Sequence, residues 1–397
     1  MENKKIYVIY GDNPREMINE LLEGSDIGKD IGKKIDVDGL IGIKPNLVLA
    51  KESSSGATSD SGIAAGLIEY LQEKGYRNIV ILEGSWIGGD TARAYKKCGY
   101  ERLSRKYNIP LIDLKKDSYH TINIDGLDIN VCNRALEIDY LINIPVLKGH
   151  CQTRITCALK NLKGCIPDSE KRRFHTLGLD RPIACLGKAL KQDLVIVDGI
   201  IGDLDFEEGG NPVKMNRIIM GKDPVLIDSY AAELLGYNID DVPYIKMAEG
   251  LGVGSSDLKK ASIIELNKDK ATEIKINSRK VKRLVRKVKE DRACSACYAN
   301  LVHALKRLDQ QGLLNSLDKE IYIGQGYKDN KSYIQDDKYV SKNKQVHKAE
   351  RTDMNNTAGK LSGIGIGNCT ENARENIPGC PPRATRILEV LKKNCLE

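Results

Sequence analysis

The chain of 397 residues is 41% hydrophobic and 29% charged, which is enough material for two or three domains with buried cores. Its 62 basic residues exceed its 55 acidic residues by seven, but the segment 266–292 contains that whole excess, so the charge does not favour nucleic acid as a partner. The first apolar run, Ile6–Ile9, is too short for a signal peptide and no run is long enough to cross a bilayer, so we expect a cytoplasmic protein without membrane contact.

The first 265 residues alternate short β-branched runs with amphipathic segments, a pattern typical of βαβ units around a parallel sheet. The predicted strands, in chain order, are 6–10, 40–43, 78–82, 111–114, 140–144 and 193–198. The predicted helices are 14–22, 59–74, 91–107, 153–162 and 182–191, with a hairpin at 125–126. The expected fold class is therefore α/β, with a largely parallel sheet and flanking helices, and residues 1–265 form a substrate-binding domain.

Residues 266–292 are interpreted as a basic, amphipathic connector. Its apolar side chains occupy positions i, i+3, i+4 and i+7 of a predicted helix, namely Val281, Leu284, Val285 and Val288. The simplest interpretation is an interdomain helix with a solvated basic face. Two alternatives remain open for that face: docking of an acidic electron-donor protein, and nucleic-acid binding, which the low content of Phe and Trp does not favour.

A smaller cysteine-rich α/β domain is predicted at residues 293–397, with a strand at 320–323 and a closing helix at 383–393. Residues 338–360 contain few apolar side chains and are predicted to form a mobile excursion. The domain contains four cysteines in contexts typical of metal ligands, namely Cys294, Cys297, Cys369 and Cys380.

The C-x-x-C spacing of Cys294 and Cys297 lets two thiolates reach one metal from a single turn. Cys369 and Cys380 follow glycine-rich segments, where the backbone N–H groups have room to turn toward sulfur. This context favours a single 4Fe-4S cluster over a zinc site, because zinc ribbons usually present two compact C-x-x-C knuckles. A structural zinc and a thiol redox pair remain as alternatives.

Polar side chains follow several predicted strands of the first domain. Lys44 and Asn46 follow one strand, Asp198 ends another, and a dense polar stretch between residues 144 and 175 follows a third. Thr153, Thr156 and Lys160 would share one face of the predicted helix 153–162. Because ligands bind at the carboxyl edge of parallel sheets, the sequence predicts a pocket there.

Several short motifs in this region are specific when taken together: Lys44-Pro45-Asn46, Leu147-Lys-Gly-His150, Ala158-Leu-Lys160-Asn161-Leu-x-Gly164, His175, Asp193–Gly199 and Gly221–Asp228. On these motifs, residues 39–255 resemble the family named domain of unknown function 362, which is often fused to iron–sulfur modules. The resemblance implies an α/β domain and a cysteine-ligated cluster domain, and it does not imply a reaction. The chain departs from the family pattern at Gly210-Asn211-Pro212, where the family usually has Gly-Pro.

The leading hypothesis is an iron–sulfur redox enzyme that acts on a small anionic substrate. Clustered lysines would neutralise a carboxylate or phosphate, and a histidine would move protons near neutral pH. The expected catalytic residues are Lys44, His150, Lys160, His175 and Asp198. The expected substrate-binding residues are Asn46, Lys148, Thr153, Asn161 and Asp228. Two alternatives are a non-redox acid–base enzyme, an isomerase or transferase with a structural metal, and a ferredoxin-like electron carrier.

Overall fold

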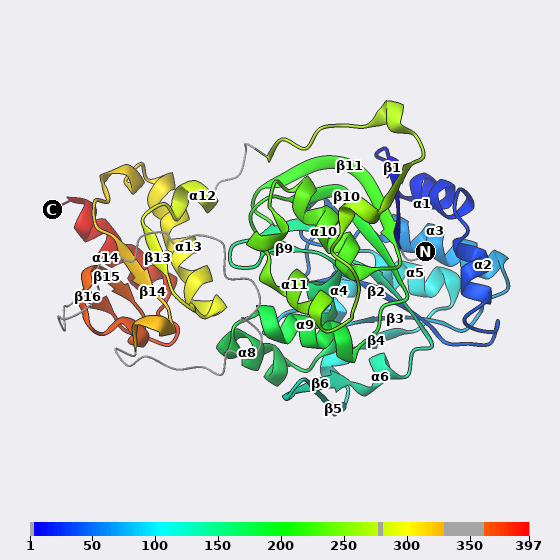
Figure 1. The fold of residues 1–397 in the computed structure, drawn as a ribbon, viewed down its shortest axis with the longest axis horizontal. Helices are drawn as coiled ribbons and strands as arrows, with labels where there is room; N and C mark the ends of the chain where they lie inside the picture. Colours follow the sequence, from blue (N-terminus) through cyan, green and yellow to red (C-terminus); the bar gives the residue numbers. More distant parts are fainter. Residues whose placement is uncertain (1–3, 277–280, 329–360, 397) are drawn as a thin grey trace. The chain divides into compact units, whose positions relative to one another are not determined.

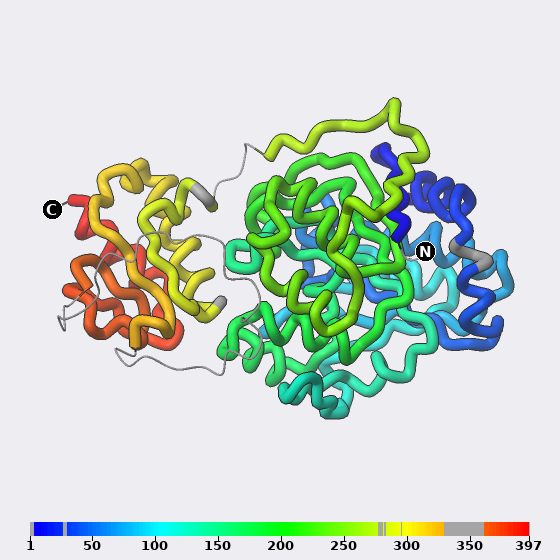
Figure 2. Tube along the Cα trace, in the orientation of Figure 1, coloured from blue at the N-terminus to red at the C-terminus, as the bar shows by residue number. Residues whose placement is uncertain are grey.

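The computed structural model describes residues 4–276, 281–328 and 361–396 (Figure 2). The chain divides into two compact units, Met1–Val281 and Lys282–Glu397 (Figure 1). The predicted excursion at 338–360 lies outside the described residues. In the part of the chain that is described, no helix is both long and apolar enough to span a membrane.

The first unit is built on a large, mostly parallel sheet (Figure 1). Its strand order is β12 (Ser262–Glu265), β1 (Lys5–Tyr10), β11 (Pro212–Gly221), β10 (Leu194–Asp203), β7 (Tyr140–Ile144), β2 (Ile41–Pro45), β3 (Ile79–Glu83) and β4 (Leu111–Asp113). β11 runs antiparallel to both of its neighbours, and the other pairs along this path are parallel. The carboxyl ends of β2, β3 and β7 therefore meet at one edge, as the sequence predicts.

Hydrophobic cores cover both faces of this sheet. Alternate residues of β1 point to opposite faces, so Ile6 and Val8 belong to one core, and Tyr7 and Ile9 to the other. The second core contains side chains of α1 (Pro14–Glu23) and α3 (Ser61–Glu73), and the first contains side chains of α9 (Asp180–Ala189), α10 (Pro224–Leu234) and α11 (Pro243–Gly250). The predicted largely parallel sheet with flanking helices is confirmed.

Two helices predicted in the first unit differ from the structure. The helix expected at 91–107 is two helices, α4 (Thr91–Lys97) and α5 (Tyr100–Tyr107), because Gly99 between them adopts a left-handed conformation with φ of 84°. The helix expected at 153–162 is wrong in its first half. There, β8 (Val146–His150) pairs with β10 and forms a hairpin with β9 (Arg154–Thr156).

Helical structure begins only after this hairpin, in α7 (Ala158–Asn161) and a following 3₁₀ turn, Leu162–Cys165. Thr153, Thr156 and Lys160 therefore do not share a helical face. Antiparallel pairing of β9 with β8, which itself pairs with the buried strand β10, overrides the local periodicity.

The remaining elements of the first unit are peripheral to the sheet path. The predicted turn at Asp125 and Gly126 joins β5 (Tyr119–Ile124) to β6 (Leu127–Cys132), and both turn residues have positive φ, as the common two-residue hairpin requires. Three further helices complete the unit: α2 (Ile27–Gly32), α6 (Asn133–Leu136) and α8 (Asp168–Leu177).

The second unit contains a four-stranded parallel sheet in chain order, with β13 (Val288–Glu290), β14 (Ile321–Ile323), β15 (Leu361–Ile366) and β16 (Ala373–Ile377). α13 (Ser295–Gln310) packs against α14 (Ala384–Leu396). The helix predicted from Val281 to Val288 forms only its first turn, α12 (Val281–Leu284). Val288 instead begins an edge strand that pairs in parallel with β14.

Candidate functional site

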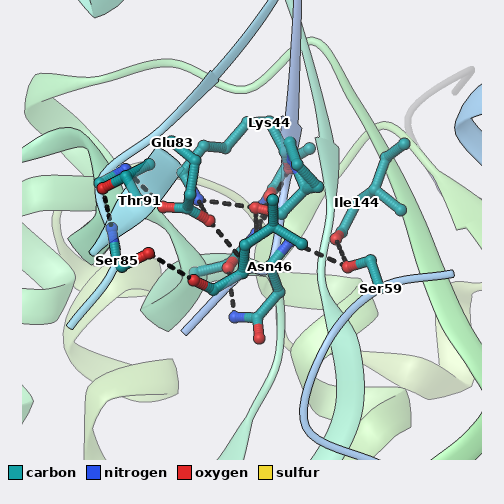
Figure 3. A network of polar contacts seen from close by, with 12 residues as sticks. Lys44, Asn46, Ser59, Glu83, Ser85, Thr91 and Ile144 are labelled. Carbon is teal, nitrogen blue, oxygen red and sulfur yellow. Dashed lines mark hydrogen bonds and ion pairs between the residues drawn. The ribbon is translucent and has the colours of Figure 1, made fainter. Parts of the chain in front are cut away.

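A buried ion pair joins the ends of β2 and β3 (Figure 3). Lys44 Nζ lies 2.8 Å from Glu83 Oε2, and the lysine is fully buried. The Glu83 carboxylate also accepts the backbone N–H groups of Leu47 at 2.9 Å and Gly84 at 2.8 Å. A Cβ on Gly164 would lie 1.9 Å from Glu83 Oε1, so only glycine fits beside the pair. Lys44 therefore positions two strand ends, and its charge is already paired.

A chain of side-chain amides continues from β2 across the edge. Asn46 donates to Asn161 Oδ1 at 2.6 Å, and Asn161 donates to Asn143 Oδ1 at 2.6 Å. The backbone N–H of Asn46 donates to the Ser59 hydroxyl, which in turn donates to the carbonyl of Ile144 at the end of β7 (Figure 3). All of the side chains in this chain are buried, so these bonds fix the relative positions of β2, β7 and α7.

Lys148 closes this network from β8. Its ammonium donates to Asn46 Oδ1 at 2.8 Å and to the carbonyls of Ala57 at 2.7 Å and Glu207 at 2.8 Å. These three acceptors use all three of its donors. Burial lowers its pKa to about 8. Lys148 thus supplies positive charge while it holds the segment that carries Glu207.

His150, at the end of β8, is a neutral hydrogen-bond donor. Its Nδ1 accepts the backbone N–H groups of Gln152 and Thr153, both at 3.1 Å, so the ring proton is on Nε2. Nε2 faces Glu207 Oε2 at 3.4 Å. Burial, and then the charge of Lys160, hold the pKa of His150 well below its usual value.

The same oxygen of Glu207 is paired with Lys160 from α7. The ammonium of Lys160 also donates to Thr156 Oγ1 at 3.3 Å, so the hydroxyl orients it. Burial alone would raise the pKa of Glu207, but the positive charge of Lys160 and contact with His150 hold it well below its usual value. Glu207 is therefore an ionised carboxylate among buried cations.

Lys163 and His175 form a second polar pair. Together with Lys148, His150, Lys160 and Glu207 they make up the Glu207 cluster. Lys163 Nζ lies 3.3 Å from His175 Nε2. Burial, and then repulsion by Lys160, lower the pKa of Lys163 to about 7. Burial and Lys163 lower the pKa of His175 to about 3, and His175 Nδ1 is buried without a hydrogen-bond partner within the described structure.

The loop that carries Glu207 is held by a buried carboxylate at the end of β10. Asp203 accepts four backbone N–H groups at 2.6–2.8 Å, from Asp205, Phe206, Gly210 and Asn211. A Cβ on Gly149 would lie 2.1 Å from the carbonyl oxygen of Leu204. Only glycine at this position lets β8 approach the loop so closely. Sequence reasoning missed Asp203 and Glu207. The available signal was the acidic, glycine-containing segment 203–210, which follows the predicted strand 193–198.

Three predicted site residues have local roles in the structure. The hydrogen bonds of Asp198 come from the backbone N–H groups of Asp60 at 2.7 Å and Ile200 at 3.1 Å, and burial raises its pKa to about 7. Asp228 accepts the first N–H groups of α7, and burial raises its pKa to about 7 as well. The hydroxyl of Thr153 donates to the carbonyl of residue 155. In these hydrogen bonds, none of the three side chains contacts a side chain of the Glu207 cluster.

The four predicted ligand cysteines all follow strands of the second sheet at its carboxyl edge. Cys294 and Cys297 follow β13 and begin α13, Cys369 follows β15, and Cys380 follows β16. Burial, and then the thiols of Cys294, Cys380 and Cys369, raise the pKa of Cys297 to about 12. The fold thus brings the four thiols into one neighbourhood from positions up to 86 residues apart in sequence.

Polar contacts connect the segments that carry these cysteines. Asn368 and Gly379 bond reciprocally: the N–H of Gly379 donates to Asn368 Oδ1 at 2.7 Å, and the N–H of Asn368 donates to the carbonyl of Gly379 at 3.2 Å. Gln325, which follows β14, donates its side-chain N–H to Cys294 Sγ at 3.1 Å. Within the described ranges, no three His, Cys, Asp or Glu side chains are grouped to hold a metal as they stand. The four thiols match the donor type of an iron–sulfur cluster.

Comparisons with known proteins match part of the chain. A curated relative, the thylakoid-associated protein sll1697 of Synechocystis sp. (strain ATCC 27184 / PCC 6803 / Kazusa), is 25% identical over 222 residues, which are 53% of this chain and 67% of that protein. Among solved structures, the lactate racemase apoprotein of Thermoanaerobacterium thermosaccharolyticum has a TM-score of 0.37 and 11% identity, and the match covers 58% of this chain and just 56% of the racemase chain.

The predicted family resemblance is confirmed over part of the first unit. Every candidate residue of that unit, from Lys44 to Asp228, lies inside the matched range, and the four cysteines lie outside it. Residues 41–233 match the family described as "Domain of unknown function (DUF362)".

Proposed function

We propose that the chain is an iron–sulfur enzyme that binds a small anionic substrate, a carboxylate or phosphate, at the carboxyl edge of the first sheet. A single 4Fe-4S cluster held by the four cysteines of the second unit would act as the electron conduit. One observation supports the binding of an anionic substrate: three lysines, Lys148, Lys160 and Lys163, all act electrostatically on the carboxylate of Glu207.

The surroundings disfavour the charged form of two of these lysines, because burial lowers the pKa of Lys148 to about 8 and that of Lys163 to about 7. Lys148 is fully buried and Lys160 is 3% exposed, so neither is well solvated. Buried cations that lack matched anions raise the free energy of the folded state. An anionic substrate would supply the missing negative charge, and the surrounding cations would strengthen its binding because they lie in a region of low dielectric constant.

The side chains of the cluster have separable tasks in this proposal. Lys160 and His150 present an N–H to the same oxygen of Glu207, so a substrate oxygen that displaced the Glu207 carboxylate from that position would meet both donors. His150 carries its proton at Nε2 and would donate a hydrogen bond from there to negative charge that develops on the substrate. Lys44 and Asn46 hold the strand ends in place.

The metal half is supported by the convergence of four thiols at one sheet edge. Cys294 precedes α13 directly, where the helix N-terminus favours a thiolate. A cluster bound there supplies one-electron transfer. The amide of Gln325 donates to Cys294 Sγ, a contact of the kind that tunes cluster potentials.

Anaerobic purification followed by iron, zinc and acid-labile sulfide analysis tests the proposal. We expect a brown protein with iron and sulfide in equal amounts and an absorption band that bleaches with dithionite. Cys297→Ser should lose the iron, whereas Cys395→Ser, which changes a cysteine on α14 outside the set, should keep it. A zinc-containing, non-bleaching protein would favour the non-redox acid–base enzyme, and a colourless protein without metal would refute the metal half.

A further inference from the structure

Lys163 has surroundings that differ from those of the other lysines in the cluster. Lys148 donates to three oxygens and Lys160 is paired with Glu207. The contact of Lys163 within the described structure is a nitrogen of His175, at 3.3 Å. A neutral imidazole does not stabilise an ammonium as a carboxylate does, so the environment favours the uncharged amine.

The charged groups that act on Lys163 come from several elements. Lys160 on α7 and Lys171 on α8 disfavour its ammonium form, Glu207 on the loop after β10 favours it, and burial disfavours it most. The resulting pKa of about 7 leaves a large fraction of the amine unprotonated at neutral pH. A desolvated lysine beside another cation is the usual form of an amine nucleophile.

Lys163 also stands in a fixed relation to Lys160. The two residues are three apart along consecutive helical turns, α7 and the 3₁₀ turn Leu162–Cys165, so they lie on one face. A ligand held there would meet an ammonium at one end and an amine at the other. A carboxylate next to a carbonyl group, as in a 2-oxo acid, matches this pair.

We propose that Lys163 is an imine-forming nucleophile and that the anionic substrate is a 2-oxo acid; this inference rests on the proposed anion site. The Nζ lone pair attacks the carbonyl carbon while the C–O π bond breaks, which gives a carbinolamine. The remaining C–O bond then breaks as the C=N bond forms. Of the two hydrogens of the amine, one stays on the protonated imine and one leaves in the water, and a proton from solvent supplies the second hydrogen of that water and the positive charge of the imine. Lys160 holds the carboxylate during the attack.

Reductive trapping on the full-length protein tests this proposal. The protein is incubated with pyruvate and cyanoborohydride at pH 7 and digested for peptide mass mapping. We expect one reduced adduct, at Lys163, with labelling roughly tenfold or more above that of exposed lysines. Acetone, which lacks the carboxylate, should label it weakly, and lactate, which lacks the carbonyl, should protect it.

Two variants control the result. Lys163→Arg keeps a long basic side chain and cannot form an imine, so it should lose the adduct while far-ultraviolet circular dichroism shows that it is folded. Lys191→Arg, which changes a 76% exposed lysine of the same unit, should keep the adduct at Lys163.

The outcomes separate this inference from the proposed function. Adducts at other lysines would overturn the inference, and so would an absent adduct when calorimetry shows that lactate binds. An absent adduct together with no binding of lactate or phosphate would overturn both the inference and the anion site.

Discussion

Removal of the carboxylate of Glu207 is the sharpest test of the cationic cluster. Glu207→Gln leaves Lys160 without its ion-pair partner and removes the anion that faces His150. Breaking a buried ion pair from one side costs about 3–5 kcal/mol. Because the Glu207 side chain is 21% exposed, we expect the lower end, about 3 kcal/mol of unfolding free energy.

The assay is urea denaturation followed by tryptophan fluorescence. Trp86 is the single tryptophan of the chain and lies in the first unit, so the signal reports that unit. Phosphate should restore about 2.7 kcal/mol to the variant when its concentration is a hundred times the dissociation constant. Wild type should gain less, because its own carboxylate occupies part of the cluster.

A surface carboxylate provides the control. Glu137 pairs with Arg134 and is 51% exposed, so Glu137→Gln should change stability by less than about 1 kcal/mol. If Glu207→Gln unfolds at the wild-type urea concentration and phosphate stabilises neither protein, the cluster is not an anion site and the reasoning fails.

Two further predictions follow from the same region. Gly164→Ala should destabilise the first unit by about 3 kcal/mol, because the new Cβ would displace Glu83. Gly250→Ala is the control: no atom lies near its Cβ, so it should stabilise α11 by up to about 1 kcal/mol. Equal melting temperatures of the two variants would contradict this prediction. The folded-state pKa of His175 is about 3, so the folded protein binds fewer protons than the unfolded chain between about pH 3 and 6.5, and stability rises with pH across that window. Relative to His175→Gln, wild type should therefore lose about 1.5 kcal/mol of unfolding free energy as the pH falls from 6.5 to 5. The raised pKa values of Asp198 and Asp228 oppose this trend, but they do so equally in both proteins. Parallel pH profiles of the two proteins would refute the low pKa of His175.

Local patterns sufficed to predict the parallel sheet and the place of the site on it. β-branched runs such as Leu194–Val197 are buried on both faces, and such runs form parallel strands. The direction of parallel strands then placed Lys44 and Asn46 at the same edge as the polar stretch after Ile144. The C-x-x-C and glycine contexts likewise singled out four cysteines that the second sheet gathers at one edge.

Contacts between distant segments determined the rest. The partner of Lys44 is Glu83, 39 residues away, and the partner of Lys160 is Glu207, 47 residues away, and no local period marks either pairing. The predicted helix at 153–162 failed because its first residues form β9, which pairs with β8, and β8 is in turn held by β10, which lies far along the chain. Secondary structure largely follows short-range sterics and hydrophobic periodicity, which the sequence shows directly. Ion pairing, burial and the resulting pKa shifts depend on which segments the tertiary structure brings together.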